Sequence, residues 1–141
     1  MYSKISNCYD KKNNNLNIIQ TRNNYSNTRD PKLWGPPLWL SLHIFSVYYD
    51  PKNEEDINRC ISFIKNLPYQ LPCFSCSEHA KNYIKDKEHD LHQICRTKKN
   101  LFEFYVDFHN YVNIRNKKRT YTYEEAWDMY SNGINMVNFS Y

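Results

Sequence analysis

Beyond about residue 39, apolar residues recur every three or four positions, which is the spacing of one face of an α-helix. Period-two alternation typical of half-buried strands is missing from the same stretch. We therefore predict helices, each with one apolar face. In chain order they cover residues 39–49, 57–67, 73–84, 99–112 and 123–134.

Proline and glycine mark the expected ends of these helices. Gly35-Pro36-Pro37 precedes the first apolar repeat and predicts a helix start there, and Asp50-Pro51 predicts its end. Pro68 predicts the end of the second helix. The chain holds only two glycines, which argues against the tight turns of an all-β fold. The pattern predicts an all-α bundle with short loops.

The first thirty residues differ from the rest of the chain. They are rich in Asn, Lys, Ser and Arg, and their few apolar residues follow no period. Such a segment buries too little surface to offset the entropy of ordering it. We expect residues 1–30 to form a flexible segment and residues 31–141 to form one folded domain.

Charge and hydropathy exclude several classes of function. The net charge of +4 is modest, and no dense basic stripe of the kind that binds nucleic acid is present. No apolar run is long enough to span a membrane, and the amino terminus lacks the apolar core of a secretory signal. We expect a soluble protein made in the cytosol, in which cysteines serve redox or metal chemistry.

Cys73 and Cys76 form a C-x-x-C motif directly behind Pro72. Both fall in the first turn of a predicted helix, where free backbone N–H groups and the helix dipole favour a thiolate. A dithiol that cycles through a disulfide needs this lowered thiol pKa. A zinc site fits the same pair, because His92 and Cys95 follow with ligand spacing. The motif alone leaves both interpretations open.

The remaining cysteines show no such pattern. Cys60 falls on the apolar face of the second predicted helix and is expected to be an inert buried thiol. Cys8 stands alone in the first segment.

Two further clusters suggest a cofactor pocket. Trp39 and His43 are four residues apart and share a helix face. His109, Val112 and Asn113 share another face, and basic residues follow them. Aromatic walls, polar edges and a cationic exit describe a pocket for a flat heterocycle that carries phosphates.

Three motifs in this order resemble the Erv/ALR family of FAD-linked sulfhydryl oxidases. They are Trp34-Gly35-Pro36 with Trp39 and His43; Pro72-Cys73 with Cys76, His79 and Tyr83; and His109-Asn110 with Val112, Asn113, Arg115 and Lys118. The likeness covers about residues 33–130. The Asn-, Lys- and Tyr-rich composition is similar to that of the minimal members encoded by large cytoplasmic DNA viruses.

The resemblance implies a four-helix bundle with a short fifth helix that binds FAD. It implies that Cys73 and Cys76 are the redox pair, with Cys73 attacked by substrate thiolates and Cys76 facing the flavin. Electrons would pass through FAD to oxygen and release hydrogen peroxide. The residues implied to bind FAD are Gly35, Trp39, His43, Tyr49, His109, Val112, Asn113 and Lys118.

The chain also departs from the family pattern. The usual L-G-K-P segment is Asn116-Lys117-Lys118-Arg119 here, so only Lys118 is matched. A second disulfide of many members is expected to be absent, because Tyr123 stands about where one of its cysteines would be. No shuttle C-x-x-C is present, and we expect substrate to reach Cys73 directly.

The resemblance further implies protein thiols as substrates, among them thioredoxin-like or virion proteins, and a homodimer packed through the first helices. A viral member would act in the host cytoplasm, at assembly sites, or in the virion. A cellular one would act in the mitochondrial intermembrane space.

Overall fold

The computed structural model describes residues 28–132, and these residues form helices without a strand. Cys8, Gly133, Ile134 and nearly all of the expected flexible segment lie outside this range. The helices, in order, are α2 (Pro31–Val47), α3 (Glu54–Gln70), α4 (Phe74–Asp86), the 3-10 turn η1 (Glu88–Asp90), α5 (Leu91–Ile94), α6 (Lys98–Arg115) and α7 (Tyr123–Ser131). The predicted all-α class is confirmed.

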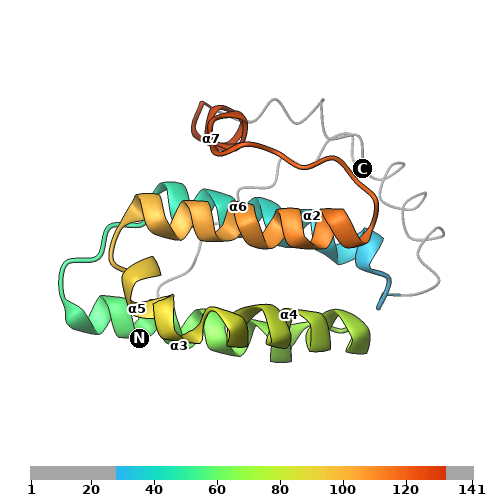
Figure 1. Ribbon diagram of the computed structural model, residues 1–141, viewed down its shortest axis with the longest axis horizontal. Coiled ribbons are helices and arrows are strands. Elements are labelled where there is room, and N and C mark those ends of the chain that lie inside the picture. The colour runs from blue at the N-terminus through green and yellow to red at the C-terminus, as the bar shows by residue number, and fades with distance from the viewer. Residues whose placement is uncertain (1–27, 133–141) are drawn as a thin grey trace, which may run out of the picture.

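The four long helices form two layers (Figure 1). Helix α2 packs on α6 in one layer, and α3 packs on α4 in the other. The short α7 packs across α2 and α6. The start of α2, the end of α6 and the start of α4 lie at the same end of the bundle (Figure 1). The three sequence motifs, at residues 34–43, 72–83 and 109–118, therefore lie near this end of the bundle.

Two apolar cores hold the bundle together. The larger lies between the layers and includes Leu42, Ile64, Leu91 and Phe108, which are almost fully buried. The smaller joins α2, α6 and α7 through Val47, Phe102, Val106, Ala126 and Tyr130. Burial of these side chains is the main source of the free energy that stabilises the bundle.

Helix α2 begins earlier than the sequence predicts. Asp30 caps the helix by accepting a hydrogen bond from the Lys32 N–H at 2.9 Å, and Pro31 occupies the first helical position. This pair is a strong start signal. The predicted start at Gly35-Pro36-Pro37 is therefore wrong, and both prolines lie inside the helix.

Two other predicted boundaries also change. Pro68 lies inside α3, which continues to Gln70, so the prediction that it ends the helix is wrong. Only one helical hydrogen bond is lost there, because a proline near the last turn removes a single N–H donor. The turn formed by η1 and α5 was not predicted, since seven residues are too few to show a period.

No helix within residues 28–132 is long and apolar enough to cross a membrane.

Candidate functional site

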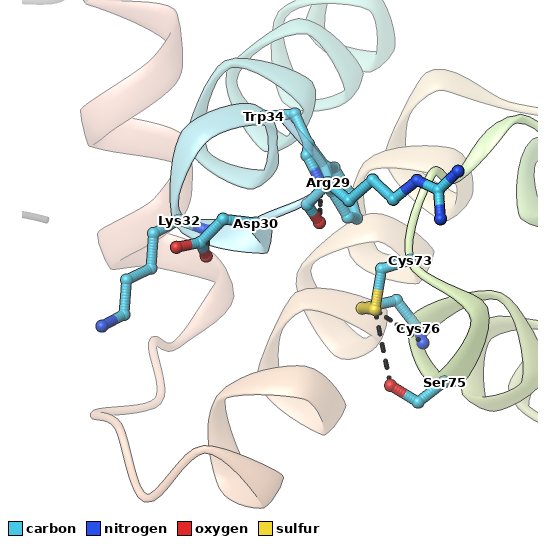
Figure 2. Close-up of a disulfide and its surroundings, with 7 residues drawn as sticks. All are labelled: Arg29, Asp30, Lys32, Trp34, Cys73, Ser75 and Cys76. Atoms are coloured by element: carbon cyan, nitrogen blue, oxygen red, sulfur yellow. Dashed lines mark hydrogen bonds between the residues drawn. A yellow bond between two sulfur atoms is a disulfide. The ribbon is translucent and has the colours of Figure 1, made fainter. Parts of the chain in front are cut away.

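Cys73 and Cys76 form a disulfide at the start of α4 (Figure 2), with their Cα atoms 5.2 Å apart. Cys73 is the N-cap residue of α4, and its Sγ accepts a hydrogen bond from the Cys76 N–H at 3.2 Å. Both cysteines are half-buried, so an incoming thiolate has access to the sulfur atoms. The predicted placement of the motif in the first turn of a helix is confirmed.

The surroundings of this disulfide include the segment that opens α2 (Figure 2). Trp34 there is half-buried, and its Nε1–H donates to the Arg29 carbonyl at 3.1 Å. In the sequence, Trp34 stands out only as part of the Trp34-Gly35-Pro36 motif. Its place beside the disulfide makes it a further residue of the candidate site.

Trp39, His43 and His109 form one aromatic cluster between α2 and α6. The rings of Trp39 and His109 stack at 4.3 Å between centroids and are 6° from parallel. His43 Nε2 and His109 Nδ1 share a hydrogen bond of 3.1 Å. The structure thus brings together three residues that the sequence assigned to one pocket.

Both imidazoles in this cluster are held neutral. Burial, and to a smaller extent the neighbouring His109, lower the pKa of His43 to about 3. Burial also lowers the pKa of His109 to about 4, with a smaller contribution from the positive charge of Lys118. At neutral pH the site is therefore an uncharged aromatic surface with a cation beside it.

One polar atom of the cluster is left unsatisfied within the described part of the chain. His43 Nδ1 is buried and has no hydrogen-bond partner there. Leaving such an atom unpaired costs about 1–3 kcal/mol, so its site favours a ligand that supplies a polar edge.

Aromatic residues that the sequence analysis left out of the site complete the surroundings of His43. Tyr130 stacks on its ring at 4.3 Å between centroids, and Phe102 lies at 5.8 Å. Phe102 and Trp127 also line a groove of about 470 Å³ beside α7. The helical period placed Tyr130 on an apolar face, but it could not show which part of the bundle α7 covers.

A basic turn follows α6. Lys118 N–H donates to the Asn113 carbonyl at 2.8 Å, and Lys117 N–H donates to the Ile114 carbonyl at 3.1 Å. This pair of bonds is a Schellman motif, in which the residue after the C-cap adopts a left-handed conformation. Lys117 does so with φ of 54°, at the position where the family pattern has glycine.

Asn110 fixes the far end of this turn. Its side-chain amide donates to the Tyr121 carbonyl at 2.8 Å and accepts from the Tyr121 N–H at 3.0 Å. Asn110 therefore holds the returning chain against α6, and with it the segment that contains Lys118.

Packed aromatic rings connect α4, which carries Cys73 and Cys76, with the cluster of Trp39, His43 and His109. Tyr83, two turns beyond Cys76 on α4, stacks on Phe108 at 4.6 Å between centroids. Phe108 in turn makes an edge contact with Trp39 at 5.2 Å. The dithiol and the candidate pocket are thus parts of one packed unit.

Three expected cofactor residues lie in different settings. A Cβ built on Gly35 would meet no atom within 4 Å, so the space beside it is open. Val112 is half-buried against the larger core. Tyr49 is turned to other partners, since its hydroxyl donates to the Cys95 carbonyl at 2.8 Å. The structure therefore does not bring Tyr49 together with the aromatic cluster.

The structure does not support the alternative zinc site. His92 Nε2 pairs with Glu54 at 2.5 Å, and Cys95 is buried in the core, whereas Cys73 and Cys76 are joined to each other. No group of three or more His, Cys, Asp or Glu side chains converges within residues 28–132.

The residues at this end of the bundle fit a flavin dinucleotide. The Trp39–His109 stack suits a flat ring system, the unpaired His43 Nδ1 suits its polar edge, and Lys118 suits phosphate.

Comparisons with known proteins agree with this description. The model of the Erv1 / Alr family matches residues 36–131. The chain is 40% identical over 91 residues to 347L of Invertebrate iridescent virus 6, named as a FAD-linked sulfhydryl oxidase; the match spans 61% of this chain and 81% of the relative. It is 29% identical over 103 residues to the FAD-linked sulfhydryl oxidase of African swine fever virus, over 72% and 82% of the two chains. No solved structure matches the chain.

Proposed function

The chain belongs to the Erv1/Alr family, and from this premise we propose that it is a FAD-linked sulfhydryl oxidase that forms disulfide bonds in protein thiols. The observation that carries the proposal is the half-exposed Cys73–Cys76 disulfide at the start of α4. A disulfide in this position can accept electrons from a thiol outside the molecule.

The reaction begins with attack by a substrate thiolate on Cys73 Sγ. A mixed disulfide forms, and Cys76 leaves as a thiolate in the first turn of α4, where backbone N–H groups and the helix dipole stabilise the negative charge. A second substrate thiolate then attacks the mixed disulfide and releases the oxidised product. Cys73 and Cys76 end as a dithiol that has gained two electrons.

The aromatic cluster and the basic turn are the parts of the chain that would hold the cofactor. Trp39, His43 and His109 would line its ring system, and Lys118 would lie toward its phosphates. The chemistry that FAD supplies when bound is two-electron transfer from the reduced dithiol to oxygen, which yields hydrogen peroxide. Because His43 and His109 are neutral, they would orient the ring without adding a positive charge to the site.

The visible absorption spectrum tests this proposal. The purified full chain should show a flavin band that bleaches when a dithiol is added and returns as oxygen re-enters. Cys73→Ala and Cys76→Ala should each bind flavin and lose turnover of the dithiol. Colourless protein without thiol oxidase activity would overturn the assignment.

Cys8→Ser is the matched control. It removes a cysteine that lies outside the described residues, and full activity in this variant would support direct access of substrate to Cys73. A large loss of turnover with protein substrates would instead assign Cys8 a relay role.

The partners and the setting follow from the same proposal. The substrates are protein thiols, such as virion or thioredoxin-like proteins, and the viral relatives favour action in the host cytoplasm or the virion. Exposed aromatic side chains on and beside α2 and α3 support a homodimer, namely Phe45, Tyr48 and Phe63. Sedimentation of the full chain at micromolar concentration tests this state, since a monomer there would contradict it.

A further inference from the structure

Two cysteines outside the proposed redox centre meet in the core. Cys60 lies on α3 and Cys95 caps the end of α5, and both pack in the larger core cluster. Helices α3 and α5 contact each other, and each of the two thiols influences the pKa of the other. The sequence predicted Cys60 to be an inert buried thiol; the structure places it at the same core cluster as Cys95, which lies 35 positions further along the chain.

The positions of the two cysteines are fixed by their neighbours. Tyr49, just beyond the end of α2, packs against the same core cluster, and its hydroxyl donates to the Cys95 carbonyl at 2.8 Å. Cys95 N–H bonds to the Leu91 carbonyl at 2.9 Å, which holds the α5 turn in place. Three segments therefore converge on the pair.

The two thiols differ in exposure and acidity. Cys60 is half-buried, whereas Cys95 has no exposed surface. The neighbouring Cys95 thiol lowers the pKa of the Cys60 thiol, whereas Cys60 and burial together raise the pKa of the Cys95 thiol. Cys60 is thus the better nucleophile and the more accessible one, with Cys95 placed to react next.

We propose that Cys60 and Cys95 form a second redox pair, which is oxidised to an intramolecular disulfide linking α3 to α5. The oxidant is another disulfide, either glutathione disulfide or the Cys73–Cys76 disulfide of a second copy of the chain. Only the second source rests on the proposed function. The pair lies apart from the bridge that many relatives carry, which the sequence analysis expected to be absent.

The exchange balances in two steps. The Cys60 thiolate attacks one sulfur of the oxidant, forms a mixed disulfide and releases one thiolate. Cys95 then attacks Cys60 Sγ, forms the intramolecular bond and releases the second thiolate, and the protons of the two cysteines end on the released thiols. Two protein thiols are oxidised, and one external disulfide is reduced.

The bond would close a loop over residues 61–94, which contains all of α4 and both cysteines of the proposed catalytic pair. A cross-link of this span restricts the unfolded chain strongly. The oxidised form should unfold at a temperature about 10–15 °C above that of the reduced form.

The test uses the full chain with Cys8→Ser, Cys73→Ala and Cys76→Ala, so that Cys60 and Cys95 are the remaining thiols. The protein is equilibrated in buffers of reduced glutathione and glutathione disulfide, denatured, alkylated and weighed by mass spectrometry. As the buffer becomes more oxidising, both alkylation sites should disappear together, without retained glutathione, and the melting temperature should rise. This background needs neither flavin nor turnover, so the result is independent of the proposed function.

Cys95→Ala in the same background is the matched control. It should retain glutathione on Cys60 and show no rise in melting temperature, because no second thiol can displace the adduct. A stable Cys60–glutathione adduct with Cys95 still present, or two free thiols in the most oxidising buffer, would overturn the proposal. Should the triple variant not fold, peptide mapping of the oxidised natural chain decides, since a linked Cys60–Cys95 peptide supports the pair and its absence refutes it.

Discussion

The imidazole of His109 lies flat on the indole of Trp39, with the ring centroids 4.3 Å apart. This contact joins α6 to α2, and the hydrogen bond between His109 Nδ1 and His43 Nε2 adds a second connection between the same helices. Helices α2 and α6, which form one wall of the candidate pocket, are thus joined through uncharged imidazoles, and protonation of these rings would weaken the contact.

Acidification should destabilise the fold through these two histidines. Their folded pKa values of about 3 and 4 lie below the value of about 6.5 expected in the unfolded chain. The unfolded state therefore binds more protons, and stability that is present above pH 6.5 is lost as the pH falls. Between pH 7.5 and 5.5 we expect the flavin-free protein to lose about 2–3 kcal/mol of unfolding free energy, measured by urea denaturation.

His109→Gln should remove about half of this pH dependence, because one of the two imidazoles then no longer titrates. The exposed His89, changed to Gln, is the control and should leave the slope unchanged. An equal slope in the His109 variant would show that other groups cause the acid sensitivity.

Gly35→Ala should separate the stability of the fold from cofactor binding. Gly35 lies within α2, and an added Cβ meets no atom within 4 Å, so the variant should gain about 0.5–1 kcal/mol in the flavin-free state. If the backbone here approaches FAD, flavin affinity should fall at least about tenfold. Asn58→Ala on the exposed face of α3 is a control that raises helix propensity away from the site.

Lys117→Gly should stabilise the protein by roughly 1 kcal/mol, because glycine adopts the left-handed conformation at this C-terminal position without steric cost. Lys117→Ala removes the same charge but keeps the Cβ, so it should give no comparable gain. The two variants can be compared by thermal unfolding at high salt. Equal gains would mean that charge rather than backbone conformation sets the effect.

Tyr123→Phe should destabilise the protein by about 1 kcal/mol. The Tyr123 hydroxyl donates to both carboxylate oxygens of Asp107, at 2.9 and 3.0 Å, and so ties the start of α7 to α6. This polar contact lies where the family pattern suggested a missing disulfide. A double-mutant cycle with Asp107→Ala should give a coupling energy of similar size, and additive effects would refute the link.

The sequence could predict the helices wherever an apolar face runs for several turns. Leu42 in α2, Ile64 in α3 and Phe108 in α6 each belong to an apolar face with the helical period. All three side chains are buried in the core. Helix ends were harder to predict, because Pro68 is a helix breaker in isolation but costs a single hydrogen bond near a last turn. The ring of Pro68 is almost fully buried, and this burial favours its place inside the helix.

The candidate site was predictable to the extent that its residues share short motifs. Trp39 with His43, and Cys73 with Cys76, are separated by one helical turn, so local spacing revealed them. Contacts such as Tyr49 with Cys95, or His43 with Tyr130, join residues that are far apart in the chain. No local period encodes such pairs, because they depend on how the helices pack.

The paired bonds between Asn110 and Tyr121 have a consequence for chain length. They fix both ends of residues 111–120, and the Schellman bonds fix Lys118 within them. An insertion or a deletion between residues 116 and 120 would displace either Lys118 or Tyr121, because both are held by hydrogen bonds to α6. By contrast, the exposed turn at residues 87–90, which connects α4 to α5, could change in length without moving the pocket. Homologous chains should therefore vary in length at the turn between α4 and α5. They should keep a constant length between residues 116 and 120.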